Sequence, residues 1–176
     1  NEKDWNGSNA GLVAIDPKTG QILTMVGSRD YFDKKIDGNY NIATANRQPG
    51  SSFKPFIYAT AFNKGFTPDS VLFDLPTEFQ TTCNAYGKAL AGYNQKDCYM
   101  PDNYDGKYRG PIKLRDALAQ SINIPAVKLF YLAGLKDSLK TAEDMGISTL
   151  TDVSRYGLTL VIGGGEVSLL DMTSAY

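Results

Sequence analysis

A Gly- and Pro-rich turn that runs directly into an apolar segment restricts this chain more than any other stretch; it spans residues 47–56 and reads RQPGSSFKPF. Within it, Ser51 precedes Lys54 by three positions. If the segment is helical from Ser52 onward, the two side chains lie on one face, one turn apart. A hydroxyl within hydrogen-bond reach of an amine is the minimum machinery for a serine nucleophile that uses lysine as its base.

Lys54 is a base only when it is uncharged, so the site must lower its pKa. Burial against the apolar residues that follow and the positive end of the helix dipole both act in that direction. The same helix start leaves backbone N–H groups that can face a developing oxyanion. Pro55 has no N–H to offer the Ser51 carbonyl, so we expect a first turn that is loose or tight rather than regular. Taken alone, the pattern is a weak signal, because a serine before a helix is usually an N-cap.

The composition excludes several other kinds of site. The 176 residues contain no histidine, which rules out Ser-His-Asp and Cys-His machinery and leaves a zinc site without its commonest nitrogen ligand. The net charge of -1 gives no electrostatic basis for binding nucleic acid. A hydrophobic content of 42% is that of an ordinary soluble globular domain. No apolar run approaches the roughly 18 residues of a membrane span and no signal peptide opens the sequence, so we expect Asn1 to be a fragment boundary. No cofactor is expected.

Hydrophobic periodicity and turn residues predict a chain that mixes helices and strands. Alternating apolar residues at 10–16 and 21–26, joined by a turn that ends at Gly20, indicate an antiparallel hairpin. Residues 75–110 lack a regular pattern, and we expect them to form a wall of a cleft or a surface excursion. Helical patterns cover residues 53–64, 114–120, 125–133 and 136–145, and a Gly-rich segment at 163–165 leads into a last helix.

A second pattern is Ser121-x-Asn123, which lies at a bend that Pro125 is expected to enforce between two helices. Such residues usually cap the helix that follows. The alternative is the Ser-x-Asn element of acyltransferases with a Ser-x-x-Lys nucleophile. A Lys-Thr-Gly triplet at 18–20 also matches these enzymes, but it lies at the tip of the expected hairpin, where glycine serves the turn. We therefore reject the triplet as a catalytic element.

Three stretches carry a resemblance to a known family: RQPGSSFKPF at 47–56, NYDGKYRGP at 103–111 and AQSINIPAV at 119–127. They resemble the transpeptidase domain of class A penicillin-binding proteins, and the likeness covers essentially the whole chain. The resemblance implies an α+β fold of the penicillin-binding and β-lactamase-like type, with an antiparallel sheet flanked by helices. It also implies a catalytic set, namely Ser51, Lys54, Ser121 and Asn123.

The resemblance implies a peptidoglycan D,D-transpeptidase. Ser51 would attack the penultimate carbonyl of a D-Ala-D-Ala stem peptide, expel D-Ala and pass the acyl group to an acceptor amine. Ser121 would carry protons to and from Lys54, while Asn123 would orient Lys54 and bind the substrate backbone. β-Lactams would acylate the same Ser51. A glycosyltransferase domain and a membrane anchor would precede the chain at the extracytoplasmic face of the bacterial membrane.

The sequence departs from the family pattern after Ser-x-Asn, because no Lys-Thr-Gly triplet follows before Tyr176. We therefore expect residues 1–176 to be the N-terminal and central part of a single transpeptidase domain, without its C-terminal strands. The alternatives are a β-lactam sensor, a β-lactamase of the same fold, and a non-catalytic fragment. Glu166 is the only carboxylate whose order fits a β-lactamase, and its place before the last helix favours a first-turn partner of the helix dipole instead.

Cys83 and Cys98 flank a polar loop within the irregular stretch. They form either a disulfide, worth about 3 kcal/mol for a loop of this size on the chain-entropy model, or two free thiols. The extracytoplasmic location that the resemblance implies favours the disulfide.

Overall fold

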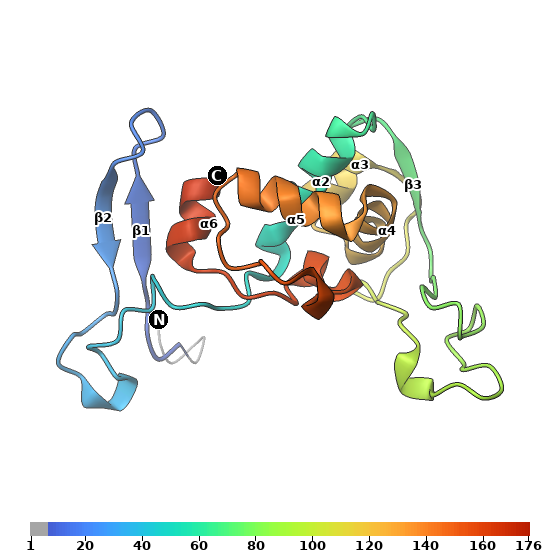
Figure 1. Ribbon diagram of the computed structural model, residues 1–176, viewed down its shortest axis with the longest axis horizontal. Helices are drawn as coiled ribbons and strands as arrows, with labels where there is room; N and C mark the ends of the chain where they lie inside the picture. Colours follow the sequence, from blue (N-terminus) through green and yellow to red (C-terminus); the bar gives the residue numbers. More distant parts are fainter. Residues whose placement is uncertain (1–6) are drawn as a thin grey trace.

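The computed structural model describes residues 7–176, so Asn1, the expected fragment boundary, lies outside the described residues. A cluster of helices occupies the middle of the molecule, a two-stranded hairpin lies at one end, and a second strand pair with a long excursion lies at the other (Figure 1). This combination confirms the expected α+β class. The helices are α2 (Lys54–Asn63), α3 (Leu114–Ala119), α4 (Asn123–Ala133), α5 (Leu135–Asp144) and α6 (Leu169–Ala175), and a 3₁₀ helix, η5, spans Leu158–Ile162.

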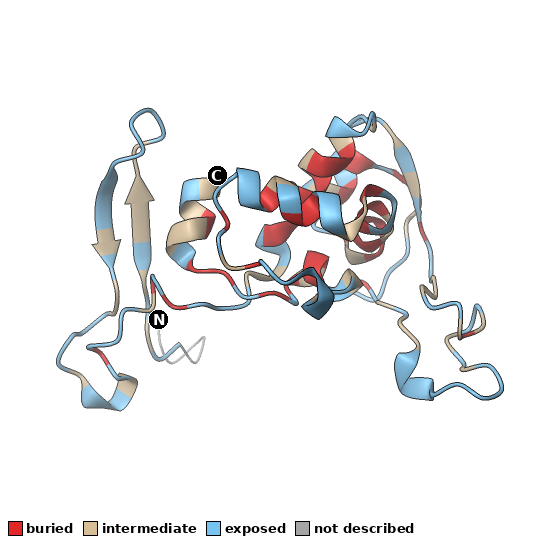
Figure 2. Cartoon of the chain, viewed as in Figure 1, coloured by how far each residue is buried: buried red, intermediate tan, exposed pale blue. Residues whose placement is uncertain are grey.

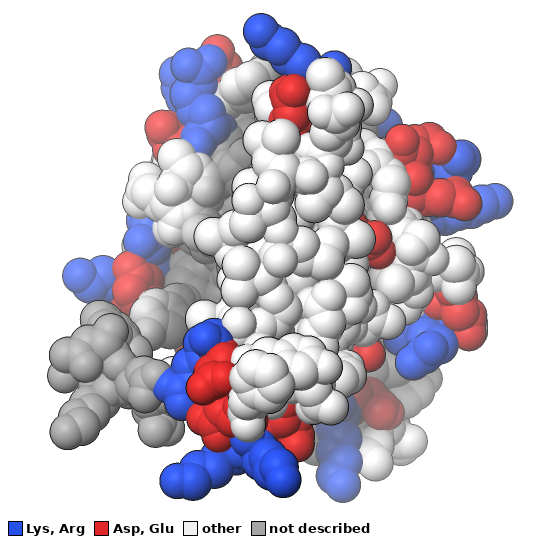
Figure 3. All heavy atoms as spheres, turned by 90° about the vertical axis from the view of Figure 1, so that its left-hand side faces the viewer, with Lys and Arg blue, Asp and Glu red and all other residues white. Residues whose placement is uncertain are grey.

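The predicted hairpin consists of β1 (Leu12–Ile15) and β2 (Ile22–Val26), which pair antiparallel. The turn between them ends at Gly20, whose φ of 71° is in the region that favours glycine. Most of β2 is exposed, with 65% of Leu23 accessible to solvent. The end of the molecule that carries the hairpin presents a broad surface with few charged side chains (Figure 3).

A second antiparallel pair joins β3 (Val71–Asp74) to β4 (Gly110–Lys113). Asp74 lies opposite Gly110, so the pair brings together the two ends of the irregular excursion, which spans residues 75–109. The part of the excursion next to these strands is called its neck. Sequence periodicity did not indicate these strands, because each has only four residues and β4 contains Gly110 and Pro111, which weaken a strand pattern. The pairing fixes where the excursion leaves the helical cluster and where it returns.

The hydrophobic core lies between the helices, and the hairpin contributes little to it (Figure 2). Helix α2 packs against both α4 and α5. Each fully buried large side chain contributes about 1.5–3 kcal/mol of burial free energy. The core therefore fixes α2 firmly at the centre of the molecule. The largest fully buried apolar side chains include Tyr58, Phe53, Phe56, Phe130, Ile57 and Leu114.

Helix α4 begins at Asn123, earlier than the predicted start at Pro125. The prediction was wrong because it treated the proline as the beginning of the helix. A proline in the first turn costs nothing in hydrogen bonding, since the N–H groups there have no partner within the helix. The consequence is that Asn123 lies on the helix rather than on the bend.

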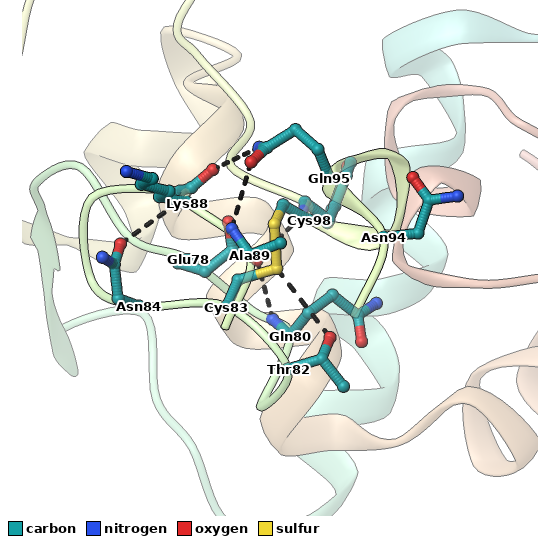
Figure 4. The surroundings of a disulfide bond; sticks show 12 residues. Glu78, Gln80, Thr82, Cys83, Asn84, Lys88, Ala89, Asn94, Gln95 and Cys98 are labelled. Carbon is teal, nitrogen blue, oxygen red and sulfur yellow. Dashed lines mark hydrogen bonds between the residues drawn. A yellow bond between two sulfur atoms is a disulfide. The ribbon is translucent and has the colours of Figure 1, made fainter. Parts of the chain in front are cut away.

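The excursion is ordered by a disulfide between Cys83 and Cys98 (Figure 4), so the free-thiol alternative is wrong. The Glu78 carboxylate lies near the two sulfur atoms, within a group whose ligand atoms are all within 4.8 Å of one another. Since both sulfurs are used in the disulfide, this group offers no thiolate to a metal. In residues 7–176 no helix has the length and apolar character needed to span a membrane.

Candidate active site

The turn that carries Ser51 is tight. Residues Gly50–Phe53 form a 3₁₀ turn, η2, and the Lys54 N–H donates to the Ser51 carbonyl three residues back. Pro55 has no N–H for that carbonyl, so the expected irregular first turn is confirmed in its tight form. Gly50 opens the turn with a φ of 58°, a conformation that glycine adopts without strain.

The Lys54 side chain is buried at the start of α2, with 1% of its surface exposed. Its Nζ donates hydrogen bonds to the Ser121 carbonyl at 2.6 Å, the Ser121 Oγ at 3.1 Å and the Asn123 Oδ1 at 2.8 Å. Burial lowers the pKa of Lys54 from 10.5 to about 8, because the ammonium loses its contact with water. An amine with this pKa is partly neutral near physiological pH and is therefore suited to act as a general base.

The Ser51 hydroxyl lies on the exposed side of the same turn. In the described part of the chain, no hydrogen bond joins its Oγ to Lys54. The N-cap explanation does not hold for either serine, because Phe53 is the N-cap residue of α2 and the Ser52 Oγ donates to the Pro49 carbonyl. The structure thus brings three of the four predicted residues into one hydrogen-bonded cluster and leaves the Ser51 hydroxyl available.

Ser121 lies in the short turn between α3 and α4 and has a φ of 54°, which is uncommon for a residue other than glycine. Its carbonyl and its hydroxyl both accept from Lys54. A backbone in this region costs about 1–3 kcal/mol and persists where the surroundings hold it, often at functional sites. The capping interpretation is wrong, since the N-cap residue of α4 is Ile122 and no side chain of its own caps the helix.

Asn123 begins α4, and its carboxamide is held from two sides. The Oδ1 accepts from Lys54, and the Nδ2 donates to the Asp102 carbonyl at 3.0 Å. The hydrogen bond joins Asn123 to the amine, and the role of Asn123 in orienting it stays a prediction. The contact with Asp102 comes from the excursion, and sequence reasoning missed it, because nothing in the spacing places residue 102 beside residue 123.

The Gly-rich segment packs against η2, the turn that carries Ser51, another contact that sequence reasoning missed. A Cβ added to Gly163 would lie 2.5 Å from the Gly50 N and Cα atoms. Close by, Arg47 and Val167 form an antiparallel bridge with backbone hydrogen bonds of 3.1 and 2.9 Å. The run of glycines at 163–165 was the available signal, since close backbone approach is one of the reasons for glycine.

Two other motif positions have local roles. Glu166 is exposed, and the prediction that it is the first-turn acidic partner of the last helix is wrong: Ser168 caps α6 and Asp171 is the acidic residue of its first turn. The triplet at 18–20 forms the tip of the β1–β2 hairpin (Figure 1). The Thr19 hydroxyl is used there in a hydrogen bond to the Asp16 carboxylate.

The structure thus places a buried lysine one turn after an exposed serine and holds its amine with a Ser-x-Asn turn, within an α+β fold. The chain belongs to the penicillin-binding protein transpeptidase family: the family described as "Penicillin binding protein transpeptidase domain" matches residues 10–158.

Its sequence relatives include penicillin-binding protein 2D of Bacillus subtilis, which is 36% identical over 167 residues, covering 94% of this chain and 22% of the relative. Penicillin-binding protein 1A of Aquifex aeolicus is 36% identical over 165 residues, covering 94% of this chain and 20% of the relative. The chain thus spans about a fifth of the length of the curated relatives it matches.

Two solved structures share the fold. Penicillin-binding protein 1A of Haemophilus influenzae matches with a TM-score of 0.77 and 32% identity, covering 96% of this chain and 23% of that one. PBP2 of Pseudomonas aeruginosa, solved in complex with WCK 5153, matches with a TM-score of 0.74 over 99% of this chain and 47% of that one. At 20% identity the second likeness concerns the fold alone.

Proposed function

We propose that this chain forms part of a D,D-transpeptidase that cross-links peptidoglycan stem peptides through an acyl-enzyme on Ser51. The observation that carries the proposal is the buried Lys54 amine, held by Ser121 and Asn123 one turn after an exposed serine. Membership of the transpeptidase family supports the reaction class.

The hydrogen bonds of Lys54 suggest how the proton moves. A neutral amine has two N–H donors and one lone pair, and the Ser121 carbonyl and the Asn123 Oδ1 are acceptors only. The two N–H groups are therefore used on these two oxygens, and the lone pair remains for a hydroxyl. Either the Ser51 or the Ser121 hydroxyl can then donate to the amine.

The proposed reaction has two halves. In the first, Lys54 takes the Ser51 proton, the serine oxygen bonds to the penultimate carbonyl carbon, and the bond to the terminal D-Ala nitrogen breaks. That nitrogen receives its proton from Lys54 through Ser121. In the second half, an acceptor amine attacks the ester, gives its proton to Lys54 through Ser121, and the Ser51 oxygen leaves and recovers a proton. The dipole at the start of α2 favours the negative charge that develops in both halves.

The same serine is proposed to be acylated by β-lactams. The wider context is also a proposal: a preceding glycosyltransferase domain and a membrane anchor, with the site on the extracytoplasmic face of the bacterial membrane. The disulfide between Cys83 and Cys98 supports an oxidising environment. The exposed carboxylate of Glu166 gives no support to a β-lactamase.

The test is acylation by a fluorescent penicillin, followed by mass spectrometry of the adduct. We expect a long-lived adduct on Ser51 that Ser51→Ala abolishes. Ser52→Ala is the matched control, because this neighbouring serine is also exposed and its hydroxyl donates to the Pro49 carbonyl. An adduct that clears quickly would indicate a β-lactamase. The absence of an adduct on both the 176-residue chain and the longest natural form of the protein would exclude the serine mechanism.

A further inference from the structure

We propose that Asn103 is a positioning residue: it sets the orientation of Asn123 and, through Asn123, the position of the Lys54 amine. This inference rests on the proposed function, because it concerns how the same site is held. The residues that carry it come from the excursion between β3 and β4, outside the two motifs.

The first observation is that α4 receives its N-terminal cap from a distant part of the chain. No side chain at its own N-cap residue, Ile122, satisfies the free N–H groups. Instead, the backbone N–H groups of Asn123 and Ile124 both donate to the Asn103 Oδ1, each at 3.1 Å. An asparagine oxygen is among the best acceptors for a helix start. Here it comes from about 20 residues upstream.

The second observation is that the Asn103 carboxamide has a single satisfactory orientation. Its Nδ2 donates to the Asp74 Oδ1 at 2.7 Å and to the Lys107 carbonyl at 2.7 Å. The Oδ1 of Asn103 thus accepts two hydrogen bonds and its Nδ2 donates two, which uses the whole hydrogen-bonding capacity of the amide. Because Asn103 is 5% exposed, a flipped amide would leave buried groups unpaired.

Asp74 anchors this amide. It is fully buried at the end of β3 and is held in turn from the other side. Its Oδ2 accepts from the Arg109 N–H at 3.0 Å and lies 3.6 Å from the Arg109 guanidinium Nη1. The neck of the excursion therefore provides a buried carboxylate that fixes the direction of the Asn103 amide.

Two neighbouring residues of the excursion, Asn103 and Asp102, both bind Asn123. Asn103 holds its backbone N–H, and the neighbouring Asp102 carbonyl holds its side-chain Nδ2. With Nδ2 occupied, the Oδ1 of Asn123 is directed at the Lys54 amine. If the Asn123 amide turned over, an N–H group would face the lysine in place of an acceptor. The excursion thus holds the group that orients the proposed base.

The experiment measures acylation by fluorescent penicillin across pH in the longest natural form of the protein. In Asn103→Ala we expect the acylation rate at saturating penicillin to fall about 10- to 100-fold, because a displacement of about 1 Å at a reacting group has effects of this size. The pH midpoint of acylation should move to lower pH, since the ammonium loses an acceptor. Amide hydrogen exchange at Asn123 and Ile124 should become faster.

A second pair of variants distinguishes an effect on the position of Asn123 from a general loss of protein stability. Asn103→Asp keeps acceptor oxygens for the α4 N–H groups but loses both Nδ2 donors and places a second carboxylate beside Asp74. Asp74→Asn in the same chain supplies a donor to that carboxylate. We expect each single variant to acylate slowly and the double variant to recover about tenfold relative to Asn103→Asp alone, as coupled neighbours do.

Asn84→Ala is the matched control. The Asn84 Oδ1 also accepts from two backbone N–H groups, those of Tyr86 and Lys88 at 3.0 and 3.1 Å, and lies in the same excursion beside the disulfide (Figure 4). Its loss should destabilise the excursion and leave the acylation rate and its pH midpoint within about twofold of the wild type, since the two sites share no partner.

The outcomes are distinct. A wild-type protein that is not labelled on Ser51 would overturn the proposed function and this inference with it. A labelled wild type with an unchanged rate and pH midpoint in Asn103→Ala would overturn the inference alone. An equal loss in Asn84→Ala, or no recovery in the double variant, would also overturn it.

Discussion

The role proposed for Lys54 combines two requirements that conflict in most proteins. A buried ammonium needs acceptors around it, and a general base must give up its proton near physiological pH. The Ser121 carbonyl and the Asn123 Oδ1 supply acceptors, and burial lowers the pKa to about 8. Both acceptors are neutral, so they add no negative charge that would favour the ammonium form.

The acylation rate should therefore depend on pH with a defined sign. Because the pKa of Lys54 is lowered from 10.5 to about 8, the neutral amine becomes the major form above that pH. We expect the acylation rate to rise with pH and to level off above about pH 9, with a midpoint near 8. Lys54→Ala should reduce the rate at the plateau by about 10²–10⁴-fold. A midpoint near 10 in the wild type would contradict the role assigned to burial.

At the scale of elements, η2, the turn that carries Ser51, packs against η5 and the glycines that follow it. Gly163 has a φ of 100° and approaches Gly50 so closely that a Cβ would lie 2.5 Å from its backbone. Gly146, at the end of α5, has nearly the same φ of 102°, but a Cβ there would meet nothing within 4 Å. An added side chain would strain the backbone about equally at the two positions, because their φ angles are nearly the same. Only at position 163 would its Cβ also clash with the Gly50 backbone.

Replacing each glycine with alanine separates these contributions. Gly146→Ala should cost about 1–2 kcal/mol of unfolding free energy, the cost of a left-handed backbone, and leave acylation unchanged. Gly163→Ala should cost at least about 1 kcal/mol more, because backbone atoms must move. It should also slow acylation, since the displaced atoms belong to the turn that carries Ser51. Urea denaturation and penicillin labelling measure both effects; equal losses of stability would show that the close contact is unimportant.

The elements that sequence could predict are those whose determinants are local. The helical stripe after Lys54 and the glycines that end α2 and α5 lie within one or two turns of the residues they control, and α2 was predicted within a residue at either end. The Ser-x-x-Lys and Ser-x-Asn patterns predicted a set of four residues, Ser51, Lys54, Ser121 and Asn123. In the described residues hydrogen bonds join the last three, and none joins the Ser51 hydroxyl to Lys54. The β3–β4 pair and the cap of α4 had no local signal, because both depend on contacts across the excursion.

At the scale of the whole molecule, most of the buried residues lie in the helical centre, and the two ends are largely exposed (Figure 2). The excursion has two parts with different roles. The neck, with Asp74 and Asn103, touches the proposed site, whereas the loop closed by Cys83 and Cys98 lies further along the chain from β3. The hydrogen bonds that the structure describes for Lys54 and for the Asn123 side chain go to residues outside the loop that the disulfide closes.

This division predicts that stability and acylation respond differently to loss of the disulfide. A bond that closes a loop with a sequence separation of 15 contributes about 3 kcal/mol on the chain-entropy model. The double variant Cys83→Ser/Cys98→Ser should lose roughly that amount in urea denaturation. Its acylation rate, measured well below the unfolding transition, should match the wild type, because the hydrogen bonds from Asp102 and Asn103 to Asn123 arise outside the closed loop. A variant that folds but no longer labels would show instead that the closed loop and the neck act as one unit.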